Sequence, residues 1–476
     1  MKSFFPVLLT AFLSLRFVAM PGGVFAQNPG SLDHSFDPGW GTNDHVSTTA
    51  IQSDGKIVIG GNFTSYNGTP RNRIARLNDD GSLDATFDPG PGANDYVSTT
   101  AIQSDGRIVI VGNFTSYNGT PRNHITRLNA DGSVDATFDP GVGTDGEYPP
   151  IYSTAIQSDG RIVIGGDFTS YNGTPRNRIA RLNADGSLDA TFDPGAGASS
   201  SVFMTTIQSD GRILIVGDFG YYNGTPRHQL ARLNTDGSLD VTFDPGAGPD
   251  YIVTRAAIKS DGRIIIGGHF TAYNGTPMNS IAGLNVDGSL DVTFDPGAGA
   301  NQRVSTIAIQ SDGRIVIGGY FTSFNGTSRY RIARLNADGS LDATFDPGVG
   351  VVGVENCYVA TSAIESDGKI IIGGRFSTYD GTPRNNIARL HGDGILGIGS
   401  MAPTGFSIFP NPASSSVTIV MPKQGRTDLV LRNALGQEVL RNTVGLGRNE
   451  VPLSGLAPGL YAAQVGAYAA QRLVVE

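Results

Sequence analysis

The sequence predicts an all-β fold, a seven-bladed β-propeller followed by a small C-terminal β-sandwich. Three observations support this prediction. A unit of about 51 residues recurs seven times, every unit holds short apolar runs separated by Asp-Gly or Asn-Gly turns, and the period stops near residue 398. Glycine supplies 65 of the 476 residues and charged residues only 16%, a composition that argues against a helical bundle or coiled coil.

The first 26 residues have the features of a secretory signal peptide. Lys2 supplies an early positive charge, an apolar run begins at Phe4, and small residues precede Gln27. The uninterrupted apolar stretch is shorter than the ~20 residues that a membrane-spanning helix needs, so a membrane anchor is the weaker interpretation. We expect cleavage after Ala26 and no integral membrane segment in the mature chain.

A tetrad Ser-Asp-Gly-Lys/Arg marks each repeat unit. The residues that precede it are Gln52, Gln103, Gln157, Gln208, Lys259, Gln310 and Glu365, at spacings of 51 to 55. A period of this length indicates that each unit is one supersecondary block whose apolar faces are covered by its neighbours.

Each unit holds four runs of strand length. In the first unit they are residues 46–51, 56–63, 72–78 and 82–87. Asp-Gly and Asn-Gly favour two-residue turns with positive φ at both central positions, so we expect an antiparallel meander of four strands. Four-stranded units of ~40–50 residues have the size of propeller blades, whereas coils of a β-helix are about half as long.

The two ends of the repeat region complement each other. The tetrad Phe-Asp-Pro-Gly first occurs at Phe36, before the first complete unit, and the last unit stops at Gly394 without a fourth run. The orphan segment Ser31–Phe36 can supply that missing strand. Closure of a ring in this way removes exposed sheet edges, which favours a propeller over residues 27–398.

The repeats resemble a known family, the delta-60 repeat proteins of bacteria. The resemblance rests on two patterns, Ser-Asp-Gly-Arg-Ile-Val-Ile-Gly-Gly-x-Phe at residues 158–168 and Leu-Asn-x-Asp-Gly-Ser-Leu-Asp-x-x-Phe at residues 182–192. It covers about three quarters of the chain. It implies a β-propeller and no established biochemical activity.

After a Gly-rich, uncharged linker at residues 399–404, a second domain is expected at residues 405–476. Short segments split by Pro and Gly, among them 406–413 and 453–461, predict a small β-sandwich. These segments closely resemble the type A sorting domain of the type IX secretion system of the Bacteroidota. The resemblance implies that the secretion machinery is a partner, and that the protein is released or attached to the outer cell surface after passing the outer membrane.

The charge balance and the absence of common motifs exclude several classes of function. With 34 Lys and Arg against 43 Asp and Glu, the chain carries a formal charge of -9 and no basic block, so we expect no nucleic-acid partner. The single cysteine, Cys357, excludes an intrachain disulfide and a cysteine-based zinc site. None of the six histidines has a zinc-ligand spacing, and no serine-hydrolase elbow or P-loop occurs. We therefore predict no catalytic residue, metal ligand or cofactor.

One pattern leaves calcium as an alternative. Asn78, Asp80, Ser82 and Asp84 place oxygens at alternate positions, like the start of a calcium loop. Glycine, however, stands at the fourth loop position instead of the sixth, and Pro89 stands where a bidentate Glu belongs. A hairpin turn is the favoured interpretation.

If Ser31–Phe36 is an outermost strand, each blade runs from the inside outward, and segment Thr64–Arg71 shares a face with the loops that follow Asp-Pro-Gly. This face repeats an aromatic residue and an arginine in most units, beginning with Tyr66 and Arg71. Such a set suits glycan binding, or it packs on its own hairpin and neighbouring blade.

A divergent position gives the candidate binding site. The residue before Phe in Gly-Gly-x-Phe changes between units while its surroundings stay constant, which a repeat architecture alone does not require. After Asn62 and Asn113, the candidates are Asp167, Asp218, His269, Tyr320 and Arg375. The long loops 142–152 and 349–359, with Glu147, Tyr148, Glu355 and Tyr358, could contribute to the same site.

The leading hypothesis is an exported or cell-surface propeller that acts as a binding module for a carbohydrate or protein ligand, because sevenfold similarity suits multivalent contact. One alternative is a polysaccharide lyase or hydrolase with its site at the channel mouth, which rests on fold analogy. The other is a ligand-free structural surface protein. We expect a binding protein rather than an enzyme.

Overall fold

The computed structural model describes residues 28–146, 151–353, 355–393, 407–409, 413–421, 427–433, 436–445, 447–466 and 471–475. They belong to two compact units, Asn28–Gly394 and a second one that includes Ile395–Glu476. The predicted signal peptide and the predicted linker lie outside the described residues. Within these ranges, no helix is long and apolar enough to cross a lipid bilayer.

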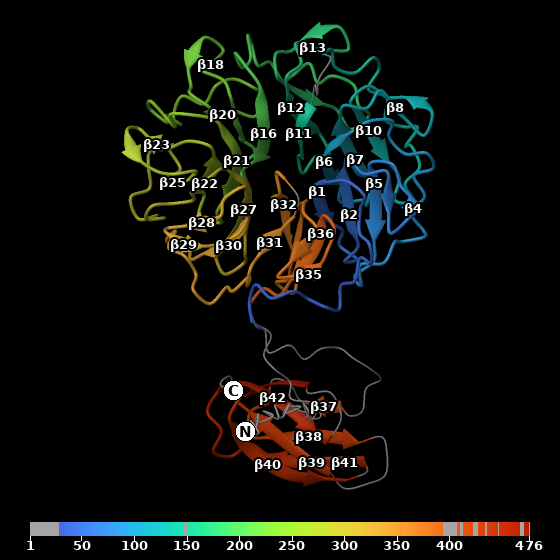
Figure 1. Cartoon of the computed structure of the whole chain (residues 1–476), viewed down its shortest axis with the longest axis vertical. Helices are drawn as coiled ribbons and strands as arrows, with labels where there is room; N and C mark the ends of the chain where they lie inside the picture. Colours follow the sequence, from blue (N-terminus) through green and yellow to red (C-terminus); the bar gives the residue numbers. More distant parts are fainter. Residues whose placement is uncertain are drawn as a thin grey trace, which may run out of the picture. The chain divides into compact units, whose positions relative to one another are not determined.

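Seven three-stranded antiparallel sheets surround a common axis as the blades of a propeller (Figure 1). We number the blades 1 to 7 in chain order. The inner strands are β1 (Val46–Ile51), β6 (Val97–Ile102), β11 (Ile151–Ile156), β16 (Val202–Ile207), β21 (Val253–Ile258), β26 (Val304–Ile309) and β32 (Tyr358–Ile364). The middle strands are β2 (Ile57–Gly61), β7 (Ile108–Gly112), β12 (Ile162–Gly166), β17 (Ile213–Gly217), β22 (Ile264–Gly268), β27 (Ile315–Gly319) and β33 (Ile370–Arg375). The outer strands are β5 (Ile74–Leu77), β10 (Ile125–Leu128), β15 (Ile179–Leu182), β20 (Leu230–Leu233), β25 (Ile281–Leu284), β30 (Ile332–Leu335) and β36 (Ile387–Leu390).

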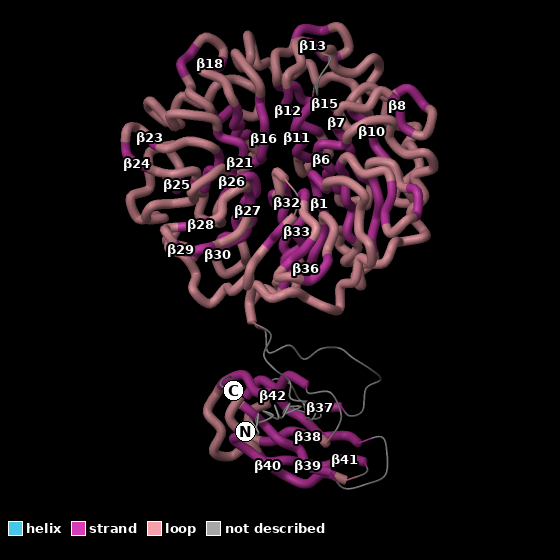
Figure 2. The backbone as a smooth tube through the Cα atoms, viewed as in Figure 1, coloured by secondary structure: helices cyan, strands magenta, loops and turns pink. Residues whose placement is uncertain are grey.

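The inner strands form a closed ring. Each packs against the inner strands of both neighbouring blades, and β32 packs against β1. Figure 2 shows these strands gathered around the centre of the propeller. Threonine hydroxyls link neighbouring blades, with Oγ1–Oγ1 distances of 3.1 Å between Thr48 and Thr100 and 3.0 Å between Thr49 and Thr361. The predicted seven-bladed propeller is confirmed.

The N-terminal segment completes the seventh blade, as predicted. Leu32 forms an antiparallel bridge with Leu390, and the Asp33 amide donates to the Arg389 carbonyl oxygen over 2.8 Å. The buried side chains of the same pair interact, since Arg389 Nε lies 2.8 Å from Asp33 Oδ2. Backbone hydrogen bonds and a buried ion pair therefore link the N-terminal segment to the last strand of the repeat region.

The fourth run of each unit is not a regular strand, so that part of the prediction is wrong. In blade 1 its ladder contact is the single bridge between Leu77 and Leu83. The Asp84 carboxylate accepts hydrogen bonds from the Thr86 amide at 2.9 Å and the Thr86 hydroxyl at 2.7 Å. It also accepts from Arg76 Nε at 2.7 Å. These side-chain hydrogen bonds replace a ladder.

The two kinds of glycine turn differ from each other. Asn67-Gly68 has φ values of 45° and 76°, the two-residue turn predicted. At the other turn, positive φ occurs only at Gly55, with 84°, and the Gln52 amide donates to the Lys56 carbonyl oxygen across three residues. The two-residue prediction was wrong there because Asp54 Oδ1 accepts the Lys56 amide, which stabilises a longer turn that ends on a left-handed glycine.

Between its middle and outer strands, each blade extends a short hairpin. The hairpins are β3–β4 (Ser65–Tyr66, Thr69–Pro70), β8–β9 (Ser116–Tyr117, Thr120–Pro121), β13–β14 (Ser170–Tyr171, Thr174–Pro175), β18–β19 (Tyr221–Tyr222, Thr225–Pro226), β23–β24 (Ala272–Tyr273, Thr276–Pro277), β28–β29 (Ser323–Phe324, Thr327–Ser328) and β34–β35 (Thr378–Tyr379, Thr382–Pro383), with β31 (Val351–Val352) added to the last. The loop after Asp-Pro-Gly contacts its hairpin, since Thr42 forms a bridge with Tyr66. Hairpins and variable loops therefore share one face, as predicted.

The C-terminal unit contains two antiparallel sheets. One has the order β37 (Ser407–Phe409), β38 (Ser416–Met421), β41 (Gly447–Pro452), and the other β40 (Glu438–Val444), β39 (Thr427–Arg432), β42 (Gly459–Val465), β43 (Gln471–Val475). Buried residues of both sheets, including Ile419, Leu431 and Val465, form one apolar cluster. The predicted β-sandwich requires two such sheets with a shared core.

Candidate functional site

A β-bulge at the start of each inner strand turns one extra side chain toward the propeller axis. In blade 1, Val46 pairs with Gly61 and Thr48 pairs with Gly60, so Ser47 between them has no partner on β2. The same register shift occurs in all seven inner strands. Bulges re-aim side chains in this way, commonly beside binding sites.

The glycine that pairs with the first residue of the bulge allows this geometry. A Cβ atom on Gly61 would collide with the His45 carbonyl oxygen. Only glycine fits such a close approach of the backbone, and every blade has glycine at this position, whereas Val111 and Val216 replace Gly60 in blades 2 and 4. The Asn62 amide can then donate to that same His45 oxygen over 3.1 Å. The divergent residue of Gly-Gly-x-Phe therefore lies beside the residue that precedes the inner strand.

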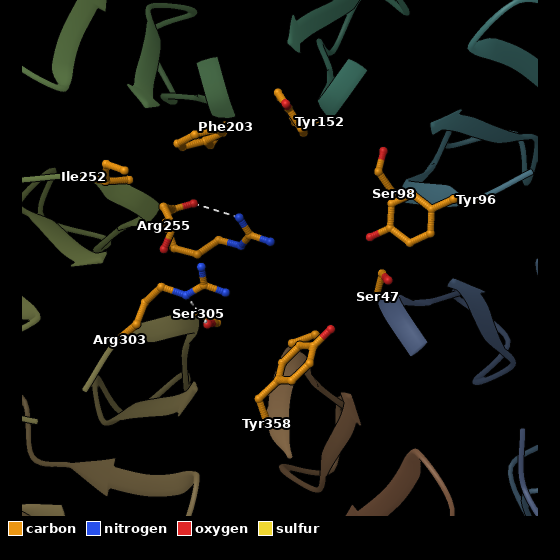
Figure 3. A pocket seen from close by; sticks show the side chains of 12 residues that line it. Ser47, Tyr96, Ser98, Tyr152, Phe203, Ile252, Arg255, Arg303, Ser305 and Tyr358 are labelled. Carbon is orange, nitrogen blue, oxygen red and sulfur yellow. Dashed lines mark hydrogen bonds between the residues drawn. The ribbon is translucent and has the colours of Figure 1, made fainter. Parts of the chain in front are cut away.

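The bulge residues of all seven blades line one cavity of about 400 Å³ at the centre of the propeller (Figure 3). These residues are Ser47, Ser98, Tyr152, Phe203, Thr254, Ser305 and Ala360. The lining is completed by Tyr96, Ile252, Arg255, Arg303 and Tyr358. The volume lies within the range of ~300–1,000 Å³ that small-molecule sites occupy. We call this space the axial cavity.

Two arginines from neighbouring blades extend into the axial cavity (Figure 3). Arg255 Nη1 donates to the Thr254 carbonyl oxygen at 2.7 Å, and Arg303 Nε donates to the Ser305 hydroxyl at 3.2 Å. No aspartate or glutamate is among the described residues that line the cavity. Burial lowers the pKa of Arg255, and the nearby charge of Arg303 lowers it further. The positive charges of Arg255 and Arg303 therefore repel each other inside the cavity.

Aromatic rings lie in the cavity wall or pack against it beside the arginines. Tyr320 and Tyr358 stack with ring centroids 4.6 Å apart and planes inclined by 9°. The guanidinium of Arg303 lies 4.6 Å from the Tyr320 centroid, a cation–π arrangement that holds Arg303 in place. Across the cavity, Tyr152 and Phe203 meet edge to face at 5.3 Å. Flat ring faces and a fixed cation are thus presented together.

A pair of hydroxyls occupies another part of the wall. Ser47 is only 9% exposed, and its Oγ makes no hydrogen bond of normal geometry within the described residues, although the Tyr96 hydroxyl faces it. Burial raises the pKa of Tyr96, so its hydroxyl keeps its proton at neutral pH. A buried polar atom without a good partner is rare in proteins and marks a place where a ligand or water can bind.

None of the five predicted candidates is among the residues that line the axial cavity. Tyr320 comes closest, because it packs on two lining residues. His269 is exposed and meets Tyr251 edge to face at 5.6 Å. Asp167 lies 3.4 Å from Arg178, and Asp218 is exposed.

Arg375 is also exposed, and it pairs across the sheet with Tyr358, a loop residue that sequence reasoning included and that does line the cavity. Glu355 lies instead in a separate pocket with Tyr330 and Cys357. Glu147 and Tyr148 lie outside the described residues.

Sequence reasoning missed the bulge residues and both arginines. The signal was present, because the residue after the first Val or Ile of the inner strand also diverges within a constant frame, from Ser47 to Tyr152 and Phe203. The same divergence before that strand runs from His45 to Arg303. A regular strand would not have placed all these side chains around one cavity, whereas the bulge does.

Charge around the mouth is unevenly distributed. Carboxylates belong to blades 1 to 4, where Asp44 accepts from Asn62 at 2.8 Å and Asp95 accepts from Asn113 at 2.7 Å, and where Asp167 and Asp218 follow. Blades 5 to 7 carry His269, Arg255, Arg303 and Arg375, whereas in blade 3 Arg178 lies 3.4 Å from Asp167 and balances its charge. Both arginines that line the cavity belong to blades 5 and 6.

The repeated aromatic residues of the hairpins are buried, which favours the interpretation that they pack on their own hairpins over the glycan-binding one. Tyr66 is 1% exposed, and its hydroxyl donates to the Gly81 carbonyl oxygen at 2.6 Å. Its equivalents Tyr117, Tyr171, Tyr222, Tyr273, Phe324 and Tyr379 are buried as well. Arg71 donates to the carbonyl oxygen of its own neighbour Pro70 at 2.9 Å. The set packs each hairpin onto its blade.

The oxygens of the calcium-like pattern take part in local hydrogen bonds. Asp80 Oδ1 accepts from the Ser82 amide at 2.9 Å and the Ser82 hydroxyl at 2.6 Å, and Asp84 contacts Arg76 as described. Among the residues with described positions, no group of three or more His, Cys, Asp or Glu side chains is arranged to hold a metal ion. Calcium stays an untested alternative to the predicted absence of a cofactor.

Seven blades, N-terminal closure and a lined cavity on the axis define the chain as a β-propeller with a potential ligand site. Residues 52–87, 103–138, 157–192, 208–243, 259–294, 310–345 and 365–396 match the family described as "Domain of unknown function (DUF5122) beta-propeller". These segments make up just over half of the chain, which therefore belongs to this family. Residues 407–476 match the secretion system C-terminal sorting domain. The protein is thus exported through the type IX system to the cell surface or beyond.

No curated protein matches the chain significantly. Among solved structures, the extracellular domain of a putative one-component system from B. thetaiotaomicron is 12% identical with a TM-score of 0.43, over 94% of this chain and 58% of that one. PorZ, a surface component of the type IX secretion system of Porphyromonas gingivalis, is 13% identical with a TM-score of 0.34, over 91% and 66%. Virginiamycin B lyase from Staphylococcus aureus is 15% identical with a TM-score of 0.42, over 73% and 94%. The chain spans less than two thirds of the first two.

Proposed function

We propose that this exported propeller is a binding module that takes a carbohydrate ligand into its axial cavity. The observation that carries the proposal is where the repeats differ. Their cores are nearly identical, yet the bulge positions carry Ser, Tyr, Phe, Thr and Ala, and the preceding positions carry Tyr, Ile and Arg. A ligand-free spacer has no need of an asymmetric set at the one place where all blades meet.

The chemistry of the lining suits a sugar. Aromatic faces such as Tyr358 and Phe203 can pack on the apolar C–H face of a pyranose ring. Hydroxyls of Ser47, Ser98 and Tyr96 can exchange hydrogen bonds with ring hydroxyls. A few placed polar groups on a largely preformed aromatic cavity are typical of small-ligand sites.

Export places this cavity where glycans occur. The sorting domain, residues 405–476 in our proposal, is the part that the secretion machinery recognises, which leaves the propeller free to present its loop-bearing face outside the cell. Whether the domain is then removed does not alter the cavity, because all of the lining residues belong to the propeller.

The test is a glycan array probed with the full chain, followed by titration of the best ligand against Tyr358→Ser. Blade 4 carries Ser201 at the equivalent position, so this substitution suits the fold. We expect about tenfold weaker binding from the lost stacking surface, equal to roughly 1.4 kcal/mol. Tyr221→Ala, at an exposed hairpin residue, is the matched control and should bind like the wild type.

Two results would overturn the proposal. Failure to bind any glycan would remove carbohydrate recognition. Equal affinity of wild type and Tyr358→Ser would show that the ligand binds outside the axial cavity.

The enzyme alternative is tested on the same samples by measuring reducing ends and unsaturated products. Release of either from the bound polysaccharide would favour a hydrolase or a lyase over a binding module.

A further inference from the structure

We propose that the axial cavity selects an acidic sugar, whose anionic group is held between Arg255 and Arg303. This inference rests on the proposed function and narrows it to a ligand class. The anionic group can be the carboxylate of a uronic acid or a sulfate ester, because both offer planar or trigonal sets of oxygens to guanidinium groups. The two sources are separated by experiment below.

The first argument is the unbalanced charge in the cavity. Arg255 and Arg303 are both half-buried, and no carboxylate is among the described lining residues. Their recorded contacts are with a backbone carbonyl oxygen, a serine hydroxyl and a tyrosine ring, none of which carries a negative charge. Two partly desolvated like charges destabilise each other, and an anion bound between them removes that penalty.

The second argument is independent of the arginines. Ser47 Oγ is buried in the same cavity without a hydrogen bond of normal geometry among the described residues. Figure 3 places Ser47 and Tyr96 on the wall that faces the two arginines. A sugar whose acidic group contacts the guanidinium groups would bring its ring hydroxyls toward this wall. Such a ligand would give Ser47 Oγ a hydrogen-bond partner besides the Tyr96 hydroxyl.

The uneven rim gives the ligand a direction. Asp44, Asp95 and Asp218 belong to blades 1, 2 and 4, whereas Arg255 and Arg303 belong to blades 5 and 6. An approaching anion is repelled by the carboxylates and attracted by the arginines. The acidic group should therefore enter beside the stacked pair Tyr320 and Tyr358, with the neutral part of the sugar toward blades 1 to 4.

The experiment is isothermal titration calorimetry of the full chain with three probes of equal length. They are a galacturonic acid trisaccharide, its methyl ester, and a galactose trisaccharide that carries 6-sulfates. The variants take residues from equivalent positions in this chain: Arg255→Met follows Met204, and Arg303→Ile follows Ile252. Arg212→Met is the matched control, because Arg212 lies at an Asp-Gly turn beside Asp210, away from the cavity lining.

We expect the acid or the sulfate to bind at least tenfold more tightly than the methyl ester. Arg255→Met and Arg303→Ile should each lower the affinity for the acidic probe at least tenfold. Their affinity for the methyl ester should stay within twofold of the wild type. Arg212→Met should bind like the wild type. Tighter binding of the carboxylate probe identifies a uronate ligand, and tighter binding of the sulfate probe identifies a sulfated ligand. Either result supports the inference.

Other outcomes overturn it. Equal binding of acid and ester, with no effect of the arginine variants, would contradict acidic selectivity while the proposed carbohydrate function survives. Binding of neutral array glycans only would have the same meaning. Absence of binding to every glycan would remove both proposals. Capture of an acidic peptide in place of any glycan, lost in Arg255→Met, would replace the sugar by a protein ligand and likewise overturn the inference.

Discussion

At the residue scale, substitutions between equivalent positions of the repeats reveal which contacts matter. Five units carry glutamine before Ser-Asp-Gly, and Gln310, for example, accepts from Arg334 Nη1 at 3.3 Å. The seventh unit carries Glu365 instead, 3.5 Å from Arg389 Nη1. Burial raises the pKa of Glu365 to about 7, even though Arg389 acts in the opposite direction. A carboxyl group with this pKa makes the closing blade sensitive to pH.

The sign of that effect follows from linkage. A carboxyl whose pKa is higher in the folded than in the unfolded protein stabilises the fold below its ordinary pKa of about 4.5, and this stabilisation is lost as pH rises through about 7. Glu365→Gln restores the residue of the other units and removes the titrating group. We expect the variant to equal the wild type near pH 5 and to be more stable by about 1–3 kcal/mol at pH 8.

Calorimetric unfolding of the propeller at both pH values measures this difference. Gln310→Asn is a control for changes of side chain at the equivalent site, and its effect should not depend on pH. A stability difference between Glu365→Gln and the wild type that is the same at pH 5 and pH 8 would contradict the assignment of the pH effect to Glu365.

At the element scale, six of the seven blades are linked to the next blade by one buried arginine of their outer strand. Arg76, for example, pairs with Asp84 and also donates to the Ala130 carbonyl oxygen of blade 2. Blade 5 has Gly283 at this position. Two other side chains take over, since Arg263 Nη1 lies 3.0 Å from Asp291 and Lys259 Nζ donates to the Ala337 carbonyl oxygen at 3.0 Å.

Lys259 therefore replaces the link that an arginine makes elsewhere. We expect Lys259→Gln to lower the stability of the propeller by about 1 kcal/mol, because it removes a charge-assisted hydrogen bond to blade 6 near the surface. Lys259→Arg, which keeps a donor of similar reach, should stay close to the wild type. Thermal unfolding of the three proteins gives the comparison, and equal stability of Lys259→Gln and wild type would show that Lys259 does not link the blades.

The strands that position the candidate site were predictable from the sequence, whereas the bulge that forms the site was not. The strands 46–51, 57–61 and 74–77 were predictable because Asp-Gly and Asn-Gly turns bound apolar runs. The bulge at Ser47 was not, since it depends on the pairing of Val46 with Gly61 across two strands. Because the bulge was not predicted, the divergent position in Gly-Gly-x-Phe indicated His269 and its equivalents. These residues lie at the end of the middle strand, whereas the cavity is lined from the inner strand.

At the scale of the whole molecule, the period and the complementary ends determined the ring. Leu32 was predictable as part of a closing strand because the last unit lacks its own copy. The convergence of Arg255 and Arg303 was not predictable in the same way. They lie 48 residues apart in sequence and meet only because inner strands of neighbouring blades pack side by side, so their shared cavity appears with the closed ring.

The central claim is that the ligand binds in the axial cavity, and hydrogen–deuterium exchange with and without a bound glycan tests it most directly. We expect added protection at the starts of the inner strands, at residues 45–48, 96–99, 252–255, 303–306 and 358–361, with little change at the Asp-Gly turns of the opposite face. Protection confined to the hairpin tips, to those turns or to the C-terminal unit would contradict the claim.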